Sequence, residues 1–454
     1  MPRLRNVRAA AFAVVAMAVT FASAREAWGN GRFPASNGVL FSPTAGTDDA
    51  TVVVRVTFGL LVTKDRGKSW GWICERAIGF SGPEDPTYVI TKSGAIVAGL
   101  FDGLRVSRDG GCTWEPVKTD ATVFVDVTMR SDGAILALAS SYDRHGDGGS
   151  LYKTQVWIST DDARSFVPLA PRFDPTLLGE TVEVAPSDPQ RVYVSAVRGD
   201  DVGRQALLLA SADGGKHWTE RATTLEGKEL AAFIAAVDPK RADRIYLRTS
   251  ASPENPTRLL VTDDAGKTYR KLLGAKGPLL GFALAADGAR IHAGGPDDGL
   301  YSGSAGALEL TPSSKLKVQC LSRAGDALWA CSSEGGGFIA GVSRDEGATF
   351  EARLHLRDIA GPLACGEGTA VAKECGVDWA KLQRELGLGG GAGAGASASA
   401  GASADAGAGA DAGAGANAAA GEAALTRDRG AWIAAIVAVI GGAALLWRAR
   451  RKGA

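Results

Sequence analysis

Adjacent aspartates occur at five places in this 454-residue chain, and four of these pairs lie between residues 161 and 298. Pairs of carboxyl groups are what glycoside hydrolases use as acid and as nucleophile or base. Each of these pairs, however, lies in a predicted turn, where an aspartate caps backbone N–H groups or faces solvent. We therefore expect structural roles for all of them, and we predict no catalytic residue. These four pairs are Asp161–Asp162, Asp200–Asp201, Asp263–Asp264 and Asp297–Asp298.

Histidine chemistry is equally sparse. The stretch "YDRHGDGGS" places His145 and Asp147 near Asp143, which could line a cation site, but a solvated loop explains the same composition. His217 stands beside Trp218 inside a repeated turn, where we expect a structural role. Glycine pairs occur at turns and not at the spacing of a phosphate-binding loop. We expect no metal site and no cofactor.

One turn recurs along the chain with the pattern Ser/Thr-x-Asp-x-Gly-x-Ser/Thr-aromatic, and we call it the box. Successive copies start 44, 52, 52, 51 and 81 residues apart, so the last gap has room for two units. Halfway through that gap, "GLYSGSAGALEL" (299–310) has the same strand-turn-strand character without the aspartate, which makes seven units. The six boxes are TKDRGKSW (63–70), SRDGGCTW (107–114), STDDARSF (159–166), SADGGKHW (211–218), TDDAGKTY (262–269) and SRDEGATF (343–350).

Turn chemistry explains each box. The aspartate carboxylate can accept hydrogen bonds from N–H groups of its own loop, the glycine can take a positive φ, and the aromatic side chain can pack inward. An apolar strand precedes each box and another strand begins at its aromatic residue, so the box joins a hairpin. The structural residues are Asp65, Gly67, Trp70, Asp109, Gly111, Trp114, Asp161, Phe166, Asp213, Gly215, Trp218, Asp264, Gly266, Tyr269, Asp345, Gly347 and Phe350.

Further strands complete each unit. Residues 180–197 and 231–249 both consist of a strand, an Asp-Pro turn and a second strand. Four short strands in a repeat of ~40–52 residues are typical of a propeller blade. We predict an all-β, seven-bladed β-propeller over residues 25–376. Its ring closes through a first strand at 37–42, or through pairing of 360–374 with the N-terminal strands, and 377–388 form a short capping helix with Asp378 as N-cap.

The six boxes resemble the Asp-box, or bacterial neuraminidase repeat, of sialidases, sortilin-type receptors, xyloglucan-cleaving glucanases and the photosystem II assembly factor. The resemblance covers roughly residues 36–376. It implies a propeller whose boxes lie between the third and fourth strands of each blade, away from the central axis. The chain departs from the pattern at Ala163, which replaces glycine, and at His217, which replaces serine or threonine. Because these families catalyse, bind peptides or assist assembly, the resemblance indicates a fold and not one function.

The resemblance to sialidases implies what an enzyme of this kind would need. It would use three arginines to hold a carboxylate, a tyrosine nucleophile activated by a glutamate, an aspartate acid/base and an early Phe/Tyr-Arg-Ile-Pro motif. The segment "GRFP" (31–34) does not match that motif, and Arg55, Arg105 and Arg248 lie in predicted strands as surface or channel-lining residues. The glucanases place paired aspartates in a cleft between two propellers, and this chain has only one propeller. An exo-sialidase-like glycoside hydrolase remains the alternative.

Both ends of the chain carry targeting features. Residues 1–24 combine three arginines, an apolar run and Ala22-Ser23-Ala24, as a cleavable bacterial signal peptide does. Residues 389–430 form an alanine- and glycine-rich flexible linker, and 431–447 form an uncharged transmembrane helix. The basic tail at 448–454 places the C-terminus in the cytoplasm. We predict an exported propeller held at a membrane by one helix.

Charge and cysteine content fit an exported protein. The chain has 50 basic and 50 acidic residues; without the three arginines of the signal and the four basic residues of the tail, 43 basic residues remain. This mildly acidic body argues against nucleic-acid binding. Disulfides persist in an oxidising compartment, so we expect all six cysteines to be paired. Local pairing predicts Cys74–Cys112, Cys320–Cys331 and Cys365–Cys375.

These features together favour a binding or scaffolding module over an enzyme. A propeller presents two loop-rich faces that can hold a protein, a peptide or a glycan. Envelope assembly is a narrower variant of the same prediction. The sequence does not identify the ligand or the face that binds it.

Overall fold

The structure is a computed structural model that describes residues 34–42, 51–65, 67–82, 84–146, 149–199 and 204–388. The predicted signal peptide, linker, membrane span and basic tail lie outside these residues. Within the described part of the chain, no helix is both long and apolar enough to cross a membrane.

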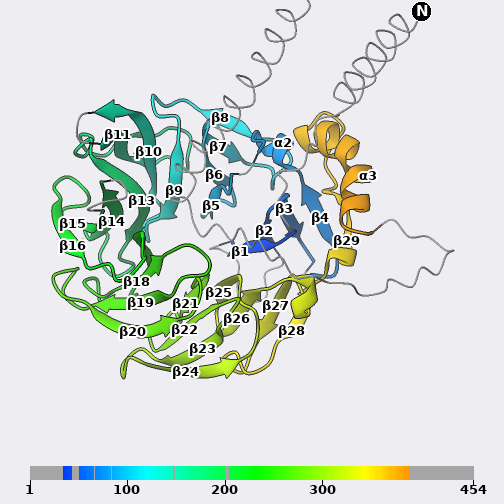
Figure 1. The fold of residues 1–454 in the computed structure, drawn as a ribbon. Coiled ribbons are helices and arrows are strands. Elements are labelled where there is room, and N and C mark those ends of the chain that lie inside the picture. The colour runs from blue at the N-terminus through cyan, green and yellow to red at the C-terminus, as the bar shows by residue number, and fades with distance from the viewer. Residues whose placement is uncertain are drawn as a thin grey trace, which may run out of the picture.

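Seven β-sheets form a ring of blades, which confirms the predicted propeller (Figure 1). Each blade contains four antiparallel strands that follow one another in the sequence, with the first strand nearest the centre. Blades 1 to 3 contain β1 (Ser36–Phe41), β2 (Val52–Val56), β3 (Gly59–Thr63), β4 (Trp70–Ile73); β5 (Thr87–Ile90), β6 (Ile96–Leu100), β7 (Gly103–Ser107), β8 (Glu115–Val117); and β9 (Phe124–Met129), β10 (Ile135–Gly146), β11 (Gly149–Ser159), β12 (Val167–Pro168).

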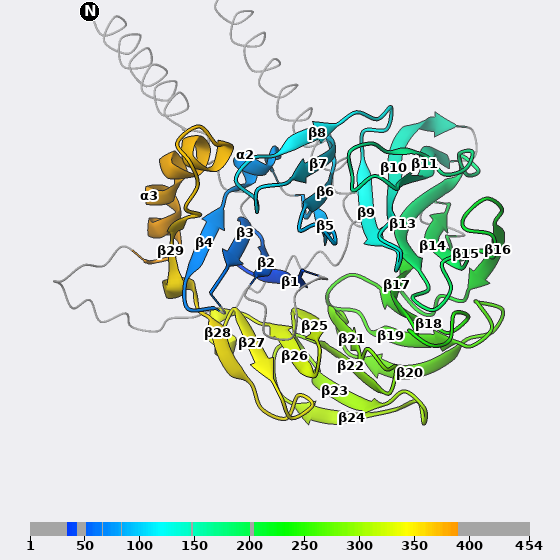
Figure 2. The ribbon, with the colours of Figure 1, turned by 180° about the vertical axis from the view of Figure 1, so that it is seen from behind.

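Blades 4 to 7 repeat this arrangement, and Figure 2 shows the complete ring from behind. Their strands are β13 (Leu177–Val184), β14 (Val192–Arg198), β15 (Gln205–Ser211), β16 (Thr219–Thr223); β17 (Ala231–Val237), β18 (Ile245–Ser250), β19 (Thr257–Thr262), β20 (Arg270–Ala275); β21 (Gly281–Leu284), β22 (Arg290–Gly295), β23 (Gly299–Ser304), β24 (Glu309–Ser314); and β25 (Cys320–Ala324), β26 (Ala327–Cys331), β27 (Ala340–Ser343), β28 (Glu351–Leu354).

Apolar side chains fill the space between neighbouring blades. Val97 of blade 2 and Ile135 and Trp157 of blade 3 belong to one buried cluster, and similar clusters join other pairs of blades. The middle strands are buried along their length, as in β3 and β6. Such strands lie between two sheets and therefore consist of nearly continuous apolar residues.

The box loops connect the third and fourth strands of six blades, as the resemblance implied. In the first loop, Asp65 accepts hydrogen bonds from the N–H groups of Lys68 and Ser69 and from the hydroxyls of Thr63 and Ser69. The other five aspartates accept equivalent bonds. The loops therefore have the structural role that turn chemistry predicts.

The two departures from the box pattern keep the same loop geometry. Ala163 takes the place of the glycine at a φ of 59°, in the left-handed region that favours glycine. The imidazole of His217 takes the place of the hydroxyl, with Nδ1 lying 2.5 Å from Oδ2 of Asp213. These residues change the side chain and not the path of the backbone.

The ring uses both of the expected closing segments. Strand β1 is the innermost strand of blade 1, and β29 (Ile359–Pro362) runs parallel to β4 as a fifth, outermost strand. Blades 7 and 1 share no strand, and side chains join them instead. The hydroxyl of Ser36 donates to Ser332 O and Ile339 O, and that of Ser322 donates to Val39 O.

Two of the three predicted disulfide pairings are wrong. Cys320 pairs with Cys331 as expected, but Cys74 pairs with Cys375 and Cys112 with Cys365. Local pairing assumed that each short segment folds back on itself. The segment after β29 instead lies against blades 1 and 2, which brings its two cysteines to partners far away in sequence. We call residues 359–388 the C-terminal strap.

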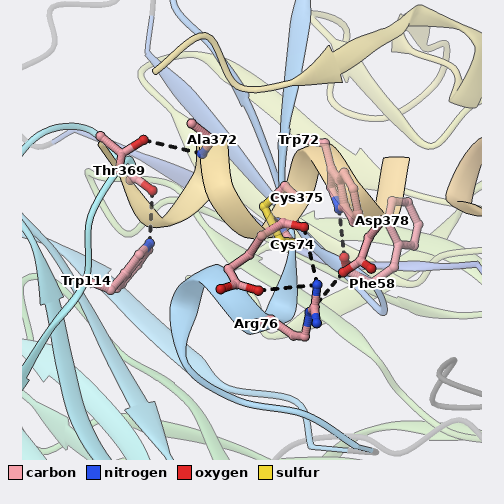
Figure 3. Close-up of a disulfide and its surroundings, with 11 residues drawn as sticks. Phe58, Trp72, Cys74, Arg76, Trp114, Thr369, Ala372, Cys375 and Asp378 are labelled. Carbon is pink, nitrogen blue, oxygen red and sulfur yellow. Dashed lines mark hydrogen bonds and ion pairs between the residues drawn. A yellow bond between two sulfur atoms is a disulfide. The ribbon is translucent and has the colours of Figure 1, made fainter. Parts of the chain in front are cut away.

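The strap ends in a helix, α3 (Gly376–Glu385), packed at the outer edge of blade 1 (Figure 3). Its N-cap is Cys375, so the predicted cap at Asp378 is wrong by one turn. The carboxylate of Asp378 instead lies 3.0 Å from Nε of Arg76, in the short helix α2 (Glu75–Ile78). Three further elements are η1 (Glu334–Gly336), η2 (Leu356–Asp358) and η3 (Val371–Cys375).

Candidate functional site

The paired aspartates that could have served as acid and base hold loops in place. Asp161 is the aspartate of the third box, and its neighbour Asp162 accepts hydrogen bonds from Ser93 and Arg108 of blade 2. Asp298 accepts bonds from the N–H groups of Lys276 and Gly277. The pair at 200–201 lies outside the described residues.

The pair in the fifth box has the same kind of role. Asp264 is the box aspartate, and Asp263 forms ion pairs with Arg244 and Arg270. Arg244 also donates to Ala305 O in blade 6. These contacts join blade 5 to blade 6.

The stretch around His145 forms the end of a long hairpin between β10 and β11. Asp143 lies 2.7 Å from Nζ of Lys153, and His145 is exposed. Asp147 lies outside the described residues. No group of three metal-ligating side chains occurs in the part of the chain that the structure describes.

The charges of two of the three strand arginines act on one aspartate of a third blade. Arg55 comes from β2 in blade 1 and Arg248 from β18 in blade 5, and the charge of each acts on Asp126 from β9 in blade 3. Blades 1, 3 and 5 are not neighbours in a seven-membered ring, so these side chains can interact only across the central channel. We call Arg55, Tyr88, Asp126 and Arg248 the axial cluster.

All four residues lie near one end of the channel. Antiparallel pairing brings the loops between second and third strands to the same face as the connections between blades, and we call it the mouth face. Arg55 lies one residue before the end of β2. Arg248 lies opposite Phe233, in the half of β18 that leads to the loop between the second and third strands of blade 5. The box loops emerge at the opposite face.

Arg55 reaches the axis because the innermost strand has a glycine in its path. A Cβ at Gly38 would lie 3.1 Å from Cδ of Arg55, so a larger residue would crowd the side chain. The guanidinium carbon lies 5.8 Å from the centre of the Tyr88 ring, a cation–π contact. Within the described residues, the guanidinium makes no hydrogen bond and no ion pair.

Arg248 is held more firmly. Its Nη1 donates to the carbonyl oxygens of Leu279 and Leu280, each at 3.0 Å, and its guanidinium carbon lies 6.0 Å from the centre of the Phe233 ring. Burial, together with the like charge of Arg55, lowers the pKa of Arg248 to about 10.

The charges of both arginines act on Asp126, and the charge of Asp126 acts on Arg248. Oδ1 of Asp126 accepts from Val127 N and its Oδ2 from Val182 N, both at 2.9 Å. Burial raises the pKa of Asp126 to about 7, although these bonds and the two arginines favour the ionised form. Among the described side chains, neither arginine lies within ion-pair distance of it.

A second carboxyl lies next to Asp126. Glu183 on β13 accepts a hydrogen bond from Thr128 at 3.0 Å, and burial and the charge of Asp126 raise its pKa to about 8. With two arginines and one aspartate, the axial cluster carries a net positive charge.

Tyr88 lacks the environment of an activated nucleophile. Its side chain is buried, and burial and the carboxylates Glu84 and Asp85 raise its pKa well above the usual range. A tyrosine nucleophile needs an adjacent base or a lowered pKa. Arg105 does not join the cluster: it lies on β7, where its guanidinium packs against Gly79.

Sequence reasoning named Arg55 and Arg248 and missed Asp126 and Tyr88. Both missed residues lie in the innermost strands of blades 3 and 2, and a polar or aromatic residue in such a strand was one signal in the sequence. Gly38 was a second signal, because a glycine inside a strand often marks a close approach by another group.

No protein-family model matches this chain, and no curated protein matches it. Among solved structures, hydrazine synthase of Kuenenia stuttgartiensis aligns with 72% of this chain and 99% of its own, at 11% identity and a TM-score of 0.49. A protein of unknown function from Dyadobacter fermentans aligns with 60% and 91%, at 17% identity and 0.40. A GH74 enzyme from Niastella koreensis aligns with 70% and 71%, at 13% identity and 0.31.

Proposed function

We propose that the propeller is a non-enzymatic binding module that holds a carboxylate of its protein, peptide or glycan ligand at the axial cluster. One observation carries the proposal. The guanidinium of Arg55 reaches the channel mouth and makes no hydrogen bond to the described residues. A guanidinium offers five donors in a planar fork that matches a carboxylate, so this group is free to bind one.

The charge of the axial cluster supports an anionic ligand. The charges of two arginines act on one aspartate, Asp126, so positive charge is in excess. In surroundings of low dielectric constant, an excess positive charge attracts anions more strongly than it would at an open surface. An incoming carboxylate would lie between guanidinium groups from opposite sides of the ring.

The cluster is also organised before a ligand arrives. Tyr88 and Phe233 support the two guanidinium groups, and two carbonyl oxygens fix Arg248. Side chains that are already ordered lose less conformational entropy on binding. The arrangement therefore favours affinity for a small charged group.

The surroundings fit an exported module. Three disulfides indicate an oxidising compartment. The strap places α3 at the outer edge of blade 1, so a tether that continues from its end would leave both faces of the ring open (Figure 1). We propose that the N-terminal signal and the C-terminal span predicted from the sequence hold the propeller outside a bacterial membrane, where it binds a ligand or assists envelope assembly.

An exo-sialidase-like hydrolase is the second candidate, and one observation favours it. Two arginines, a tyrosine and an aspartate do converge at the channel mouth. Two features favour binding instead: the third strand arginine packs elsewhere, and burial and nearby carboxylates keep Tyr88 protonated. An enzyme of this class would need the opposite shift.

The proposal is tested by titration calorimetry of the purified protein at pH 6.0 and low salt. Three carboxylates serve as probes: N-acetylneuraminate, glucuronate and the dipeptide glycylglutamate. Glucose is the uncharged comparison. We expect at least one carboxylate to bind and glucose to give no signal, and the probe that binds distinguishes a sugar acid from a peptide.

Arg55→Gln is the informative variant, because Arg55 makes no hydrogen bond that the fold would lose. A charge-assisted bond contributes roughly 1.5–3 kcal/mol, so we expect affinity to fall about ten- to a hundredfold. Arg108→Gln is the matched control, since Arg108 pairs with Asp162 at the box face. Equal loss in both variants, or no binding by the wild type, would contradict the proposal.

A further inference from the structure

The two disulfides that hold the strap differ in exposure. Cys74 and Cys375 are 2% and 0% exposed, and both belong to an apolar cluster that includes Leu382 of α3. Cys112 and Cys365 are both partly exposed. Thiol exchange needs access to a sulfur, and exposed disulfides are the ones that exchange most readily. A reagent in solution therefore meets the second bond before it meets the first.

The chain around Cys365 is open to solvent. We call residues 364–368 the strap loop; four of its five residues are exposed, and a Cβ added at Gly366 or Gly368 would meet no atom within 4 Å. In the described part of the chain, the hydrogen bonds of its backbone stay within the strap, since Gly366 O accepts from N and Oγ1 of Thr369. The disulfide is therefore what ties this loop to the second box, on blade 2.

We propose that the Cys112–Cys365 disulfide, the exposed bond, is a thiol-exchange site that a dithiol reductant opens in the folded protein. A thiolate of the dithiol attacks one sulfur, a mixed disulfide forms, and the other sulfur leaves as a thiolate that takes up a proton. The second thiol of the reductant then attacks the mixed disulfide and releases the second cysteine as a thiol. Two electrons and two protons pass to the protein, and the dithiol becomes a disulfide. The other two disulfides stay closed, because their four cysteines are at most 5% exposed.

The helix α3 has contacts of its own that do not depend on the exposed bond. The carboxylate of Asp378 lies 3.0 Å from Nε of Arg76 (Figure 3), and the ring centres of Trp379 and Trp72 lie 5.9 Å apart. Since Cys375 directly precedes α3, these contacts keep its disulfide covered. Reduction of the exposed bond should therefore free the strap loop, while α3 stays on blade 1. Neither cysteine of the exposed bond belongs to the axial cluster, so this site does not depend on the proposed ligand.

The direct test is reduction of the wild-type protein by dithiothreitol without denaturant. Samples are quenched with acid at intervals, free thiols are alkylated, and peptide mass spectrometry measures the labelling of each cysteine. We expect Cys112 and Cys365 to be labelled together and at least about tenfold faster than the other four, because a covered sulfur reacts only after local opening. Equal rates at all six cysteines, or earlier labelling of Cys74 and Cys375, would overturn the proposal.

Urea separates direct attack on the folded protein from attack after unfolding. Between no urea and about 2 M urea, the reduction rate of the exposed bond should change less than about twofold, whereas the two buried bonds should be reduced faster as opening becomes easier. If the rate at the exposed bond rises with urea as steeply as the rates at the buried bonds, the exposed bond also reacts through unfolding, and the proposal is wrong.

One variant tests whether the packing of α3 protects the buried bond of the strap. Leu382→Ala leaves a cavity in the apolar cluster of Cys74 and Cys375, so it should speed reduction of their bond at least about fivefold while the exposed bond keeps its rate within about twofold. Leu209→Ala, which truncates a buried leucine of blade 4, is the matched control and should not favour that bond over the hairpin disulfide.

The same variant gives a second way to overturn the proposal. If Leu382→Ala speeds reduction of both strap bonds by the same factor, one opening event exposes both of them. Because the wild-type and urea measurements need no variant, a folding defect in Leu382→Ala would not prevent the test.

Discussion

Cys375 forms a disulfide with Cys74 across 301 residues of sequence, and this bond joins the last helix to the first blade (Figure 3). The bond between Cys112 and Cys365 lies beside it and spans 253 residues. Because blades 7 and 1 share no strand, these two bonds and β29 take the place of a strand that would close the ring.

The two long-range bonds should not contribute independently to stability. With one bond present, the other closes only the short loop made of residues 74–112 and 365–375. Removing the first bond by alanine substitution should therefore cost roughly 3–4 kcal/mol, and removing the second should cost more, about 5 kcal/mol, because a long loop is then freed. Urea denaturation measures the two steps. It is applied to the two variants that each lack one of these bonds and to the variant that lacks both.

The Cys320–Cys331 bond provides the control. It spans 11 residues within one hairpin, so its removal should cost about 2–3 kcal/mol and add to the other effects. If removing the second of the two long-range disulfides costs the same free energy as removing the first, or less, the two bonds do not close the same loop.

The box aspartates should make the fold sensitive to acid. Hydrogen bonds within the loops lower the pKa values of Asp65, Asp161 and Asp345 to about 2. Their unfolded values lie near 4, so the stabilisation is present above pH 4 and is lost as pH falls towards 2. Thermal unfolding followed between pH 5 and pH 2 should show a steep decrease in Tm over this window.

One box variant tests the cause of that decrease. Asp161 accepts bonds from the N–H groups and hydroxyls of its loop, and its replacement by alanine should lower the free energy of unfolding by roughly 2 kcal/mol at pH 7. Asp161→Asn keeps one acceptor oxygen and should cost less. Equal losses for the two variants would argue that the hydrogen bonds are not the source.

Glu180 should destabilise the fold at alkaline pH. It is buried at a bulge of β13, and its Oε2 has no hydrogen-bond partner among the described residues. Burial raises its pKa to about 8, so the folded state keeps a proton that the unfolded state releases above about 4.5. Stability from this group therefore falls as pH rises from about 4.5 to 8.

Glu180→Gln removes that titration. The variant should be more stable than the wild type by roughly 1–3 kcal/mol at pH 8.5 and about equal to it at pH 4.5. Urea denaturation at the two pH values measures the difference. A variant that is less stable at both would indicate that the carboxyl has a partner that an amide cannot replace.

Glu346 should stabilise the contact between blades 6 and 7. Its carboxylate lies 3.1 Å from His292, 3.2 Å from Arg323 and 3.4 Å from Arg290, while its backbone carbonyl accepts a bond from Ser302. Glu346→Ala removes the carboxylate partner of the poorly exposed Arg323, which keeps its hydrogen bond to Asp326 O. We expect a loss of roughly 1–3 kcal/mol by denaturation, and a change under 0.5 kcal/mol would contradict this role.

The fold could be predicted because its blades correspond to repeats of short sequence segments. Six boxes and the strands around them specify hairpins that form by short-range contacts, and the degenerate sixth unit keeps its strands at β23 and β24. The disulfide pairs could not be predicted, since they depend on where the strap runs after blade 7. Nothing in the residues around Cys365 indicates a partner on blade 2.

The axial cluster was only partly predictable for a similar reason. Strand alternation marks Arg55 and Arg248 as unusual, but their approach depends on the number of blades and on the glycine at position 38. Asp126 and Tyr88 look like ordinary strand residues until the ring is closed. Contacts across the axis join residues that no local pattern relates.

The measurement that tests the central claim most directly is hydrolysis of a panel of fluorogenic glycosides by the purified protein. The panel should include sialosides, glucuronides and neutral glycosides, assayed from pH 5 to pH 8. A binding module predicts no turnover above the rate without protein, while free carboxylates still bind in a manner that depends on Arg55. Turnover that disappears in Arg55→Gln and Asp126→Asn would contradict the account and identify the axial cluster as a catalytic site.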